Sequence, residues 1–93
     1  MKIIFKHSNR CPISVRAKSE MDNFLKNYPG EIEYEFIDVI SNRDRSNEVA
    51  EVYGVTHESP QILIFDDHDK IIWTTSHNHI TEKNIDDAVA GEI

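Results

Sequence analysis

The order of strand-like and helix-like segments constrains the fold of this chain more than any other feature of its sequence. Short apolar or alternating runs typical of strands are interrupted by segments whose apolar residues recur at helical spacing. These patterns predict strands at 3–6, 32–39, 61–65 and 70–75, and helices at 12–28, 43–53 and 82–90. The predicted order of elements is therefore β-α-β-α-β-β-α.

Individual residues support the ends of the predicted helices. Pro12 suits a first helical position, because the N–H that it lacks would have no partner there. Ser41 or Asn42 can cap the second helix, and Gly54 can take the left-handed conformation that ends it. Thr81 is a suitable cap for the third helix.

This order of elements points to one architecture. A β-α-β unit requires parallel strands with a right-handed crossover, whereas the hairpin at 61–75 adds antiparallel strands. The simplest solution is an α/β fold with a four-stranded mixed sheet and flanking helices, in the order of the thioredoxin fold. Because the 93 residues contain no repeat or linker-like segment, we expect a single thioredoxin-like domain over residues 1–93.

The charge and hydropathy patterns exclude several classes of partner. Seventeen Asp and Glu against ten Lys and Arg give a net charge of −7, which argues against binding to a nucleic-acid backbone. The longest apolar runs, such as 62–65, are too short to span a bilayer or to form a signal-peptide core. We therefore expect a cytoplasmic protein with no nucleic-acid or membrane partner.

The single cysteine, Cys11, is the residue on which the function depends. One cysteine cannot form an internal disulfide, so it is a buried filler, a metal ligand, an intermolecular crosslink or a reactive thiol. Residues 1–20 hold five Lys and Arg against one Glu, although such runs are usually just solvated surface. The only thiol thus lies in the only basic segment, which favours a reactive thiol.

The predicted position of Cys11 also favours a reactive thiol. At the start of a helix, N–H groups such as those of Ile13 and Ser14 lack intrahelical acceptors, and a thiolate can accept from them. Neighbouring Arg10 favours the same charged form. The alternative is that Cys11 is buried and inert, as many lone cysteines are.

The segment Cys11-Pro12-Ile13-Ser14 has the spacing of a redox C-x-x-C motif in which a hydroxyl replaces the second thiol. Ser14 cannot resolve a mixed disulfide, but its hydroxyl can donate a hydrogen bond to the Cys11 thiolate. The alternative is an ordinary polar residue early in a helix. A monothiol site needs a second thiol from outside, so the motif implies a low-molecular-weight thiol as partner.

The pair Ser59-Pro60 opens the third predicted strand. Proline at a strand start usually marks only an edge strand or the end of a loop. In a chain of thioredoxin order, however, this segment faces the cysteine. We therefore expect a cis bond before Pro60 that leaves the Ser59 backbone free to pair with a thiol substrate.

The histidines raise the question of a metal site. His77 and His79 lie close in sequence, and His7, His57 or Cys11 could complete a tetrahedral set. No second C-x-x-C or H-x-x-x-H pair supports that set, so we expect no metal. Three scattered glycines also provide no phosphate-binding loop.

Several motifs together resemble the YtxJ family, the monothiol bacilliredoxins of Firmicutes that use bacillithiol. The matching residues are Phe5-Lys6-His7-Ser8, Cys11-Pro12-Ile13-Ser14, Tyr53-Gly54-Val55, His57-Glu58-Ser59-Pro60-Gln61, Trp73 and Thr75-Ser76-His77. The resemblance implies a thioredoxin fold, Cys11 as the sole redox thiol and Ser59-Pro60 as the cis-proline element beside it. It also implies bacillithiol as co-substrate, with no bound cofactor, and S-bacillithiolated client proteins as partners.

The sequence departs from the family pattern in two places. Family members commonly carry a helix before the first strand, whereas this chain begins at Met1-Lys2, so we expect that face to be bare or the sequence to be shortened. The residue before the cysteine is commonly Thr and is Arg10 here. The resemblance implies a monothiol oxidoreductase that removes bacillithiol from proteins. The alternative is a non-catalytic thioredoxin-like binding or redox-sensing module, and arsenate reduction or iron–sulfur carriage is less well supported.

Overall fold

The computed structural model describes residues 1–91, and the expected domain end at residue 93 lies outside them. The predicted order of elements is confirmed, with one short 3-10 helix, η1, that the sequence patterns did not indicate. The elements are β1 (Lys2–His7), α1 (Pro12–Asn27), β2 (Glu33–Asp38), α2 (Arg43–Tyr53), β3 (Gln61–Phe65), β4 (Ile71–Ser76), η1 (His77–His79) and α3 (Glu82–Ala90).

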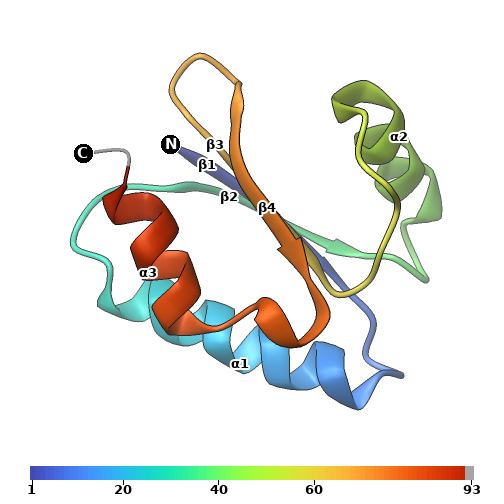
Figure 1. Ribbon diagram of the computed structural model, residues 1–93. Helices are drawn as coiled ribbons and strands as arrows, with labels where there is room; N and C mark the ends of the chain where they lie inside the picture. Colours follow the sequence, from blue (N-terminus) through green and yellow to red (C-terminus); the bar gives the residue numbers. More distant parts are fainter. Residues whose placement is uncertain (92–93) are drawn as a thin grey trace.

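The strands form a four-stranded mixed sheet in the order β2-β1-β3-β4 (Figure 1). β1 pairs in parallel with β2 and antiparallel with β3, and β3 pairs antiparallel with β4. In this register Lys6 lies between Ile37 of β2 and Gln61 of β3. β1 and β3 are therefore the central strands, and nearly all of their residues are buried. The expected four-stranded α/β architecture is confirmed.

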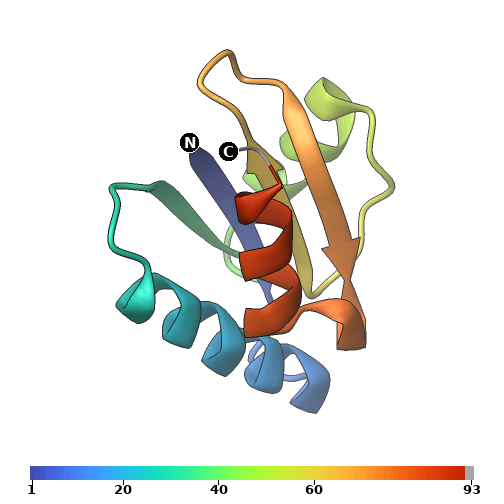
Figure 2. The same cartoon turned by 60° about the vertical axis from the view of Figure 1, so that its left-hand side comes forward.

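Helices cover both faces of the sheet, with α1 and α3 on one face and α2 on the other (Figure 2). Successive residues of a strand point to opposite faces, so Ile3 and Phe5 pack beneath α1 and α3. Ile4 packs with Val49 of α2 on the other face. Each face thus has its own apolar cluster, and the fully buried central strands separate the two.

The buried stripe of α1 runs along one side of the helix. Its residues are Ser14, Ala17, Met21 and Phe24, at the spacing of successive helical turns. Within residues 1–91, no helix combines the length and the apolar character needed to cross a membrane.

The helix ends agree with the sequence in three places and differ in one. α1 begins at Pro12, as expected. Thr81 caps α3 by accepting a hydrogen bond from the backbone N–H of Asn84 at 3.1 Å. Gly54 ends α2 with φ 64°, the left-handed conformation expected for it. Asn42 occupies the cap position of α2, but its side chain makes no capping hydrogen bond. Its ψ of 54° departs from the extended conformation in which a capping side chain usually reaches the first helical turn.

The left-handed conformation of Gly54 gives a stability prediction. A Cβ added there would meet no atom within 4 Å, so the only cost of Gly54→Ala is the backbone conformation. We expect a loss of about 1–2 kcal/mol in the free energy of unfolding, measured by urea denaturation. Gly91→Ala is the control, because Gly91 has a right-handed helical backbone with φ −64°. An equal loss in both variants would contradict this explanation.

Candidate functional site

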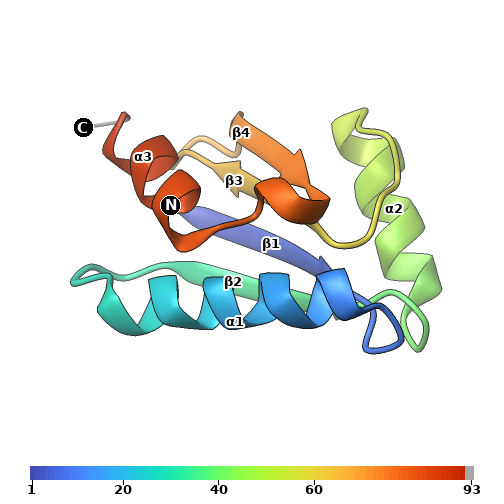
Figure 3. The same ribbon diagram turned by 60° about the horizontal axis from the view of Figure 1, so that its bottom comes forward.

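The candidate site lies at one edge of the sheet. The parallel strands β1 and β2 end there, and the antiparallel strand β3 begins there. Figure 3 shows the loop between β1 and α1, the loop between β2 and α2 and the start of β3 at this same edge. The segment that carries Cys11 and the segment that carries Ser59 and Pro60 therefore adjoin neighbouring strands at the same edge.

Cys11 is the N-cap residue of α1 and has an extended backbone conformation, with φ −111° and ψ 119°. Its backbone N–H donates to the Ser8 carbonyl at 3.2 Å, and its carbonyl accepts from the N–H of Val15 at 3.1 Å. The thiol is free and partly exposed, and it makes no capping hydrogen bond to the helix. The backbone of Cys11 is thus held from both sides while its sulfur stays accessible.

Ser14 holds the loop before Cys11 against α1. Its hydroxyl oxygen accepts a hydrogen bond from the backbone N–H of Ser8 at 2.9 Å and lies 2.9 Å from Nδ1 of His7. Both Ser14 and His7 are buried. Because Ser14 is fixed in the helix and Ser8 in the loop, this small network limits the movement of the loop that ends at Cys11.

The sequence predicted a hydrogen bond from the Ser14 hydroxyl to Cys11, and the structure gives that hydroxyl other partners. Within residues 1–91 it bonds to Ser8 and His7, and no hydrogen bond joins it to Cys11. The reason is the helical period, which places Ser14 on the buried stripe of α1, facing β1. The role of Ser14 in stabilising the Cys11 thiolate stays a prediction.

His7 is the residue of this site that the sequence patterns missed. The predicted first strand ends at residue 6, whereas His7 is the last residue of β1 and is only 6% exposed. Its ring stacks on Phe5 and lies against Phe36 of β2, with centroids 6.0 and 5.4 Å apart. The alternation of Ile3, Phe5 and His7 on one strand face was the signal that could have identified it.

The surroundings of Cys11 combine charge with exposed apolar side chains. Arg10 and Pro12 are both exposed, and Arg10 has no ion pair within residues 1–91. Ile13 is 38% exposed and Val15 is 50% exposed on the first turns of α1.

Ser59 and Pro60 form the other half of the site. The peptide bond between them is cis. Pro60 is buried, and its carbonyl accepts a hydrogen bond from the N–H of His77 at 3.0 Å, which ties this segment to η1. The Ser59 hydroxyl oxygen is buried and has no hydrogen-bond partner within residues 1–91.

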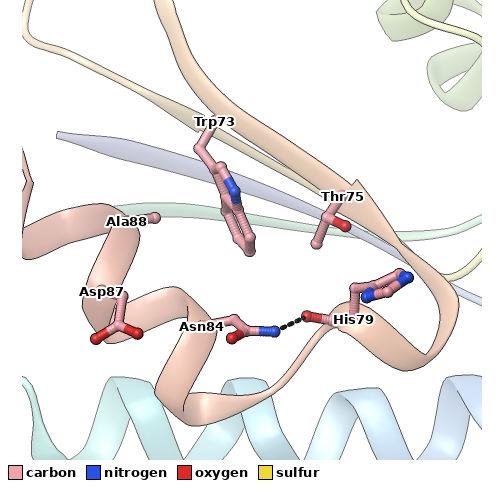
Figure 4. Close-up of a pocket in the computed structure, with 6 residues that line it drawn as sticks. All are labelled: Trp73, Thr75, His79, Asn84, Asp87 and Ala88. Atoms are coloured by element: carbon pink, nitrogen blue, oxygen red, sulfur yellow. Dashed lines mark hydrogen bonds between the residues drawn. The ribbon is translucent and has the colours of Figure 1, made fainter.

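A hollow of about 430 Å³ lies between β4, η1 and α3, and none of its lining residues is a predicted site residue (Figure 4). The Asn84 amide donates to the His79 carbonyl at 2.9 Å across it. The other histidine of this segment, His77, lies 3.5 Å from Glu58. Within the described part of the chain, no three His, Cys, Asp or Glu side chains gather as metal ligands do.

Comparison with known protein families matches residues 1–85 to the family described as monothiol bacilliredoxin BrxC. Among solved structures, the chain is similar to a thioredoxin-fold protein proposed to be an oxidoreductase, with 30% sequence identity and a TM-score of 0.86. That match covers 95% of this chain and 76% of the other.

Two thioredoxins are similar to this chain in fold alone. Thioredoxin 1 from Thermosipho africanus is 21% identical with a TM-score of 0.76, covering 99% of this chain and 93% of that one. Desulfothioredoxin from Desulfovibrio vulgaris Hildenborough is 19% identical with a TM-score of 0.71, covering 97% and 79%. With the family match over most of its length, this chain belongs to the monothiol bacilliredoxins and is a thiol-disulfide oxidoreductase of the thioredoxin fold.

Proposed function

We propose that this protein removes bacillithiol from protein mixed disulfides through Cys11. The observation that carries the proposal is an accessible lone thiol at the start of α1, followed three residues later by a serine in place of a second thiol. The family implies thiol-modified proteins as clients in general. The proposed clients are S-bacillithiolated proteins of the cytoplasm.

The reaction has two exchange steps. The Cys11 thiolate attacks the bacillithiol sulfur of the mixed disulfide, so a Cys11–bacillithiol disulfide forms and the client leaves as a thiolate that takes up a proton. A second bacillithiol then attacks the bacillithiol sulfur on Cys11. This step releases bacillithiol disulfide and regenerates the Cys11 thiolate, so bacillithiol is a co-substrate and no bound cofactor is needed.

The other site residues have separate proposed roles. Arg10 favours the thiolate by its charge, and Pro12 starts α1 so that the free N–H groups of its first turn lie close to Cys11. Ser14 holds the loop before Cys11 in place through Ser8 and His7. These residues are proposed to position Cys11 and to favour its thiolate form, whereas Cys11 alone forms a bond to the substrate.

Ser59 and Pro60 are proposed to hold the disulfide substrate. They precede β3 at the edge of the sheet where the Cys11 loop also lies. The Ser59 backbone supports this role, because it makes no backbone hydrogen bond within residues 1–91 and its N–H and C=O can pair with a substrate. An extended substrate lying along this segment would present its disulfide to Cys11.

The proposed function predicts a covalent adduct on Cys11. When the protein is mixed with a bacillithiolated test protein, we expect its mass to rise by one bacillithiol less two hydrogens and the test protein to lose its adduct. Cys11→Ser is expected to show neither change, as followed by mass spectrometry. If wild type also leaves the test protein modified, the non-catalytic binding or sensing module becomes the better interpretation.

The Ser14 network predicts a change in both stability and reactivity. Ser14→Ala leaves the Ser8 N–H and His7 without their partner, so we expect a loss of about 1–3 kcal/mol in unfolding free energy. The looser loop should also alter the rate at which iodoacetamide alkylates Cys11. Ser19→Ala is the matched control, because Ser19 is an exposed serine of α1. If both variants resemble wild type in both measurements, the network does not hold the loop.

A further inference from the structure

The strongest unexplained feature of the molecule is a lysine inside its sheet. Lys6 lies on β1, facing α2, and has no exposed surface. Burial lowers the pKa of its ammonium group. Buried lysines are usually paired with a carboxylate, yet within residues 1–91 Lys6 has no ion pair. The only hydrogen-bond contact of its side chain there is Nδ1 of His57 at 3.1 Å from Nζ.

This contact fixes which nitrogen of His57 carries a proton. An ammonium group only donates, so Nδ1 of His57 accepts from Lys6, and the Ser46 hydroxyl also lies 3.2 Å from that nitrogen. The neutral ring therefore carries its hydrogen on Nε2. Burial and the charges of Lys6 and Arg43 lower the pKa of His57, which favours this neutral form. Nε2–H is then the donor left for a ligand.

His57 lines a small cavity of about 170 Å³, together with Val39, Ile40, Arg43 and Asn47. Arg43 is the first residue of α2, whose N-terminus has no side-chain cap. Within residues 1–91 Arg43 has no ion pair, whereas nearby Arg45 pairs with Glu35 and Glu48. The cavity thus combines a guanidinium, an imidazole N–H, an uncapped helix start and the Lys6 charge behind them.

The acidic residues close to this cavity do not neutralise it. The Asp38 carboxylate accepts the backbone N–H groups of Ile40 and Ser41 at 2.9 and 3.2 Å, which lowers its pKa and keeps it in the turn. Asp44 is exposed in the first turn of α2. Lys6 and Arg43 therefore supply positive charge to the cavity and the neutral His57 ring supplies an N–H donor, so its natural ligand is an anion.

The cavity lies at the same edge of the sheet as Cys11. Its wall residue Val39 donates its backbone N–H to the His7 carbonyl at 2.9 Å, and His7 begins the segment that leads to Cys11. The loops 8–11 and 39–42 lie at this same edge in Figure 3. A small molecule joined to Cys11 therefore has an anion-binding cavity within the same region of the surface.

We propose that the Arg43 cavity binds the carboxylates of the low-molecular-weight thiol while its sulfur is joined to Cys11. This inference rests on the proposed function, in which that thiol is bacillithiol, whose malate group carries two carboxylates. The guanidinium of Arg43 and Nε2–H of His57 supply donors for both. The small volume of the cavity suits such a group better than an acidic peptide segment.

The first test compares two disulfides that differ in charge. Bacillithiol disulfide carries carboxylates, and hydroxyethyl disulfide carries none, while both can modify Cys11. We expect Arg43→Gln to raise about five- to tenfold the concentration of bacillithiol disulfide that gives half of the maximal rate of Cys11 modification, with the maximal rate little changed. The rate with hydroxyethyl disulfide should stay within about twofold of wild type. Arg16→Gln is the matched control, because Arg16 is also exposed and has no ion pair within residues 1–91.

The results with these two disulfides separate the outcomes. If Arg43→Gln slows Cys11 modification equally with both disulfides, or with neither, the cavity is not a carboxylate site. An equal loss in Arg16→Gln would reduce the effect to general surface charge and would also overturn it.

The second test does not depend on redox chemistry. Malate is added to Cys11→Ser, and the NMR signals of the His57 ring and the Arg43 side chain are followed. We expect both sets of signals to shift and saturate with malate in Cys11→Ser, and the His57 signals not to saturate in the double variant with Arg43→Gln. Lys6→Met, which keeps the buried shape, should weaken the response of His57 without unfolding the protein.

This titration separates the cavity from the proposed function. If wild type does not take bacillithiol onto Cys11 but malate shifts these signals, the proposed de-bacillithiolation activity is wrong and the carboxylate site is retained. If malate causes no shift, the cavity proposal fails whatever Cys11 does. If an acidic peptide binds more tightly than malate, the cavity serves client carboxylates, and its assignment to the small thiol is overturned.

Discussion

The pairing of β1 with both of its neighbours is the constraint on which the site depends. Because β1 runs parallel to β2 and antiparallel to β3, one edge of the sheet gathers the ends of β1 and β2 and the start of β3. Cys11, Ser59–Pro60 and the Arg43 cavity all adjoin that edge, although they are far apart in sequence. The two apolar clusters hold this pairing in place from both faces. Without β1 at the centre, none of these groups would share one surface.

The sequence predicted the elements of the fold well because their signals are local. Helical spacing, Gly54 and Thr81 each act through their own segment, and the structure confirms them. The partners of Ser14 and the burial of Lys6 could not be predicted in the same way. Both depend on which face of a helix or strand packs against which neighbour. Because β1 is covered on both faces, the sequence of this strand does not show which of its side chains are buried. Asn42 fails as a cap for a related reason, since the turn held by Asp38 sets its backbone conformation.

The basic character of residues 1–20 is distributed differently from what a count of charges suggests. Lys6 is buried on the α2 face, and Lys18 pairs with Asp22 at 2.7 Å and lies over the ring of Phe36. Lys2 lies over the ring of Phe65. Arg10 and Arg16 are the cations of this segment that remain exposed without an ion pair within residues 1–91. The positive charge near Cys11 therefore comes from these two arginines and, across the sheet edge, from Arg43, rather than from a continuous basic surface.

The hydrogen bonds of Ser14 also bear on how such a site can evolve. A serine at this position lacks a resolving thiol, and the same hydroxyl fastens the loop before the nucleophile. One substitution to cysteine would gain a second thiol and at the same time release Ser8 and His7. A change to two-thiol chemistry would therefore require new partners for those residues, in addition to the new cysteine. The one-thiol mechanism and the rigidity of the loop therefore depend on the same side chain, that of Ser14.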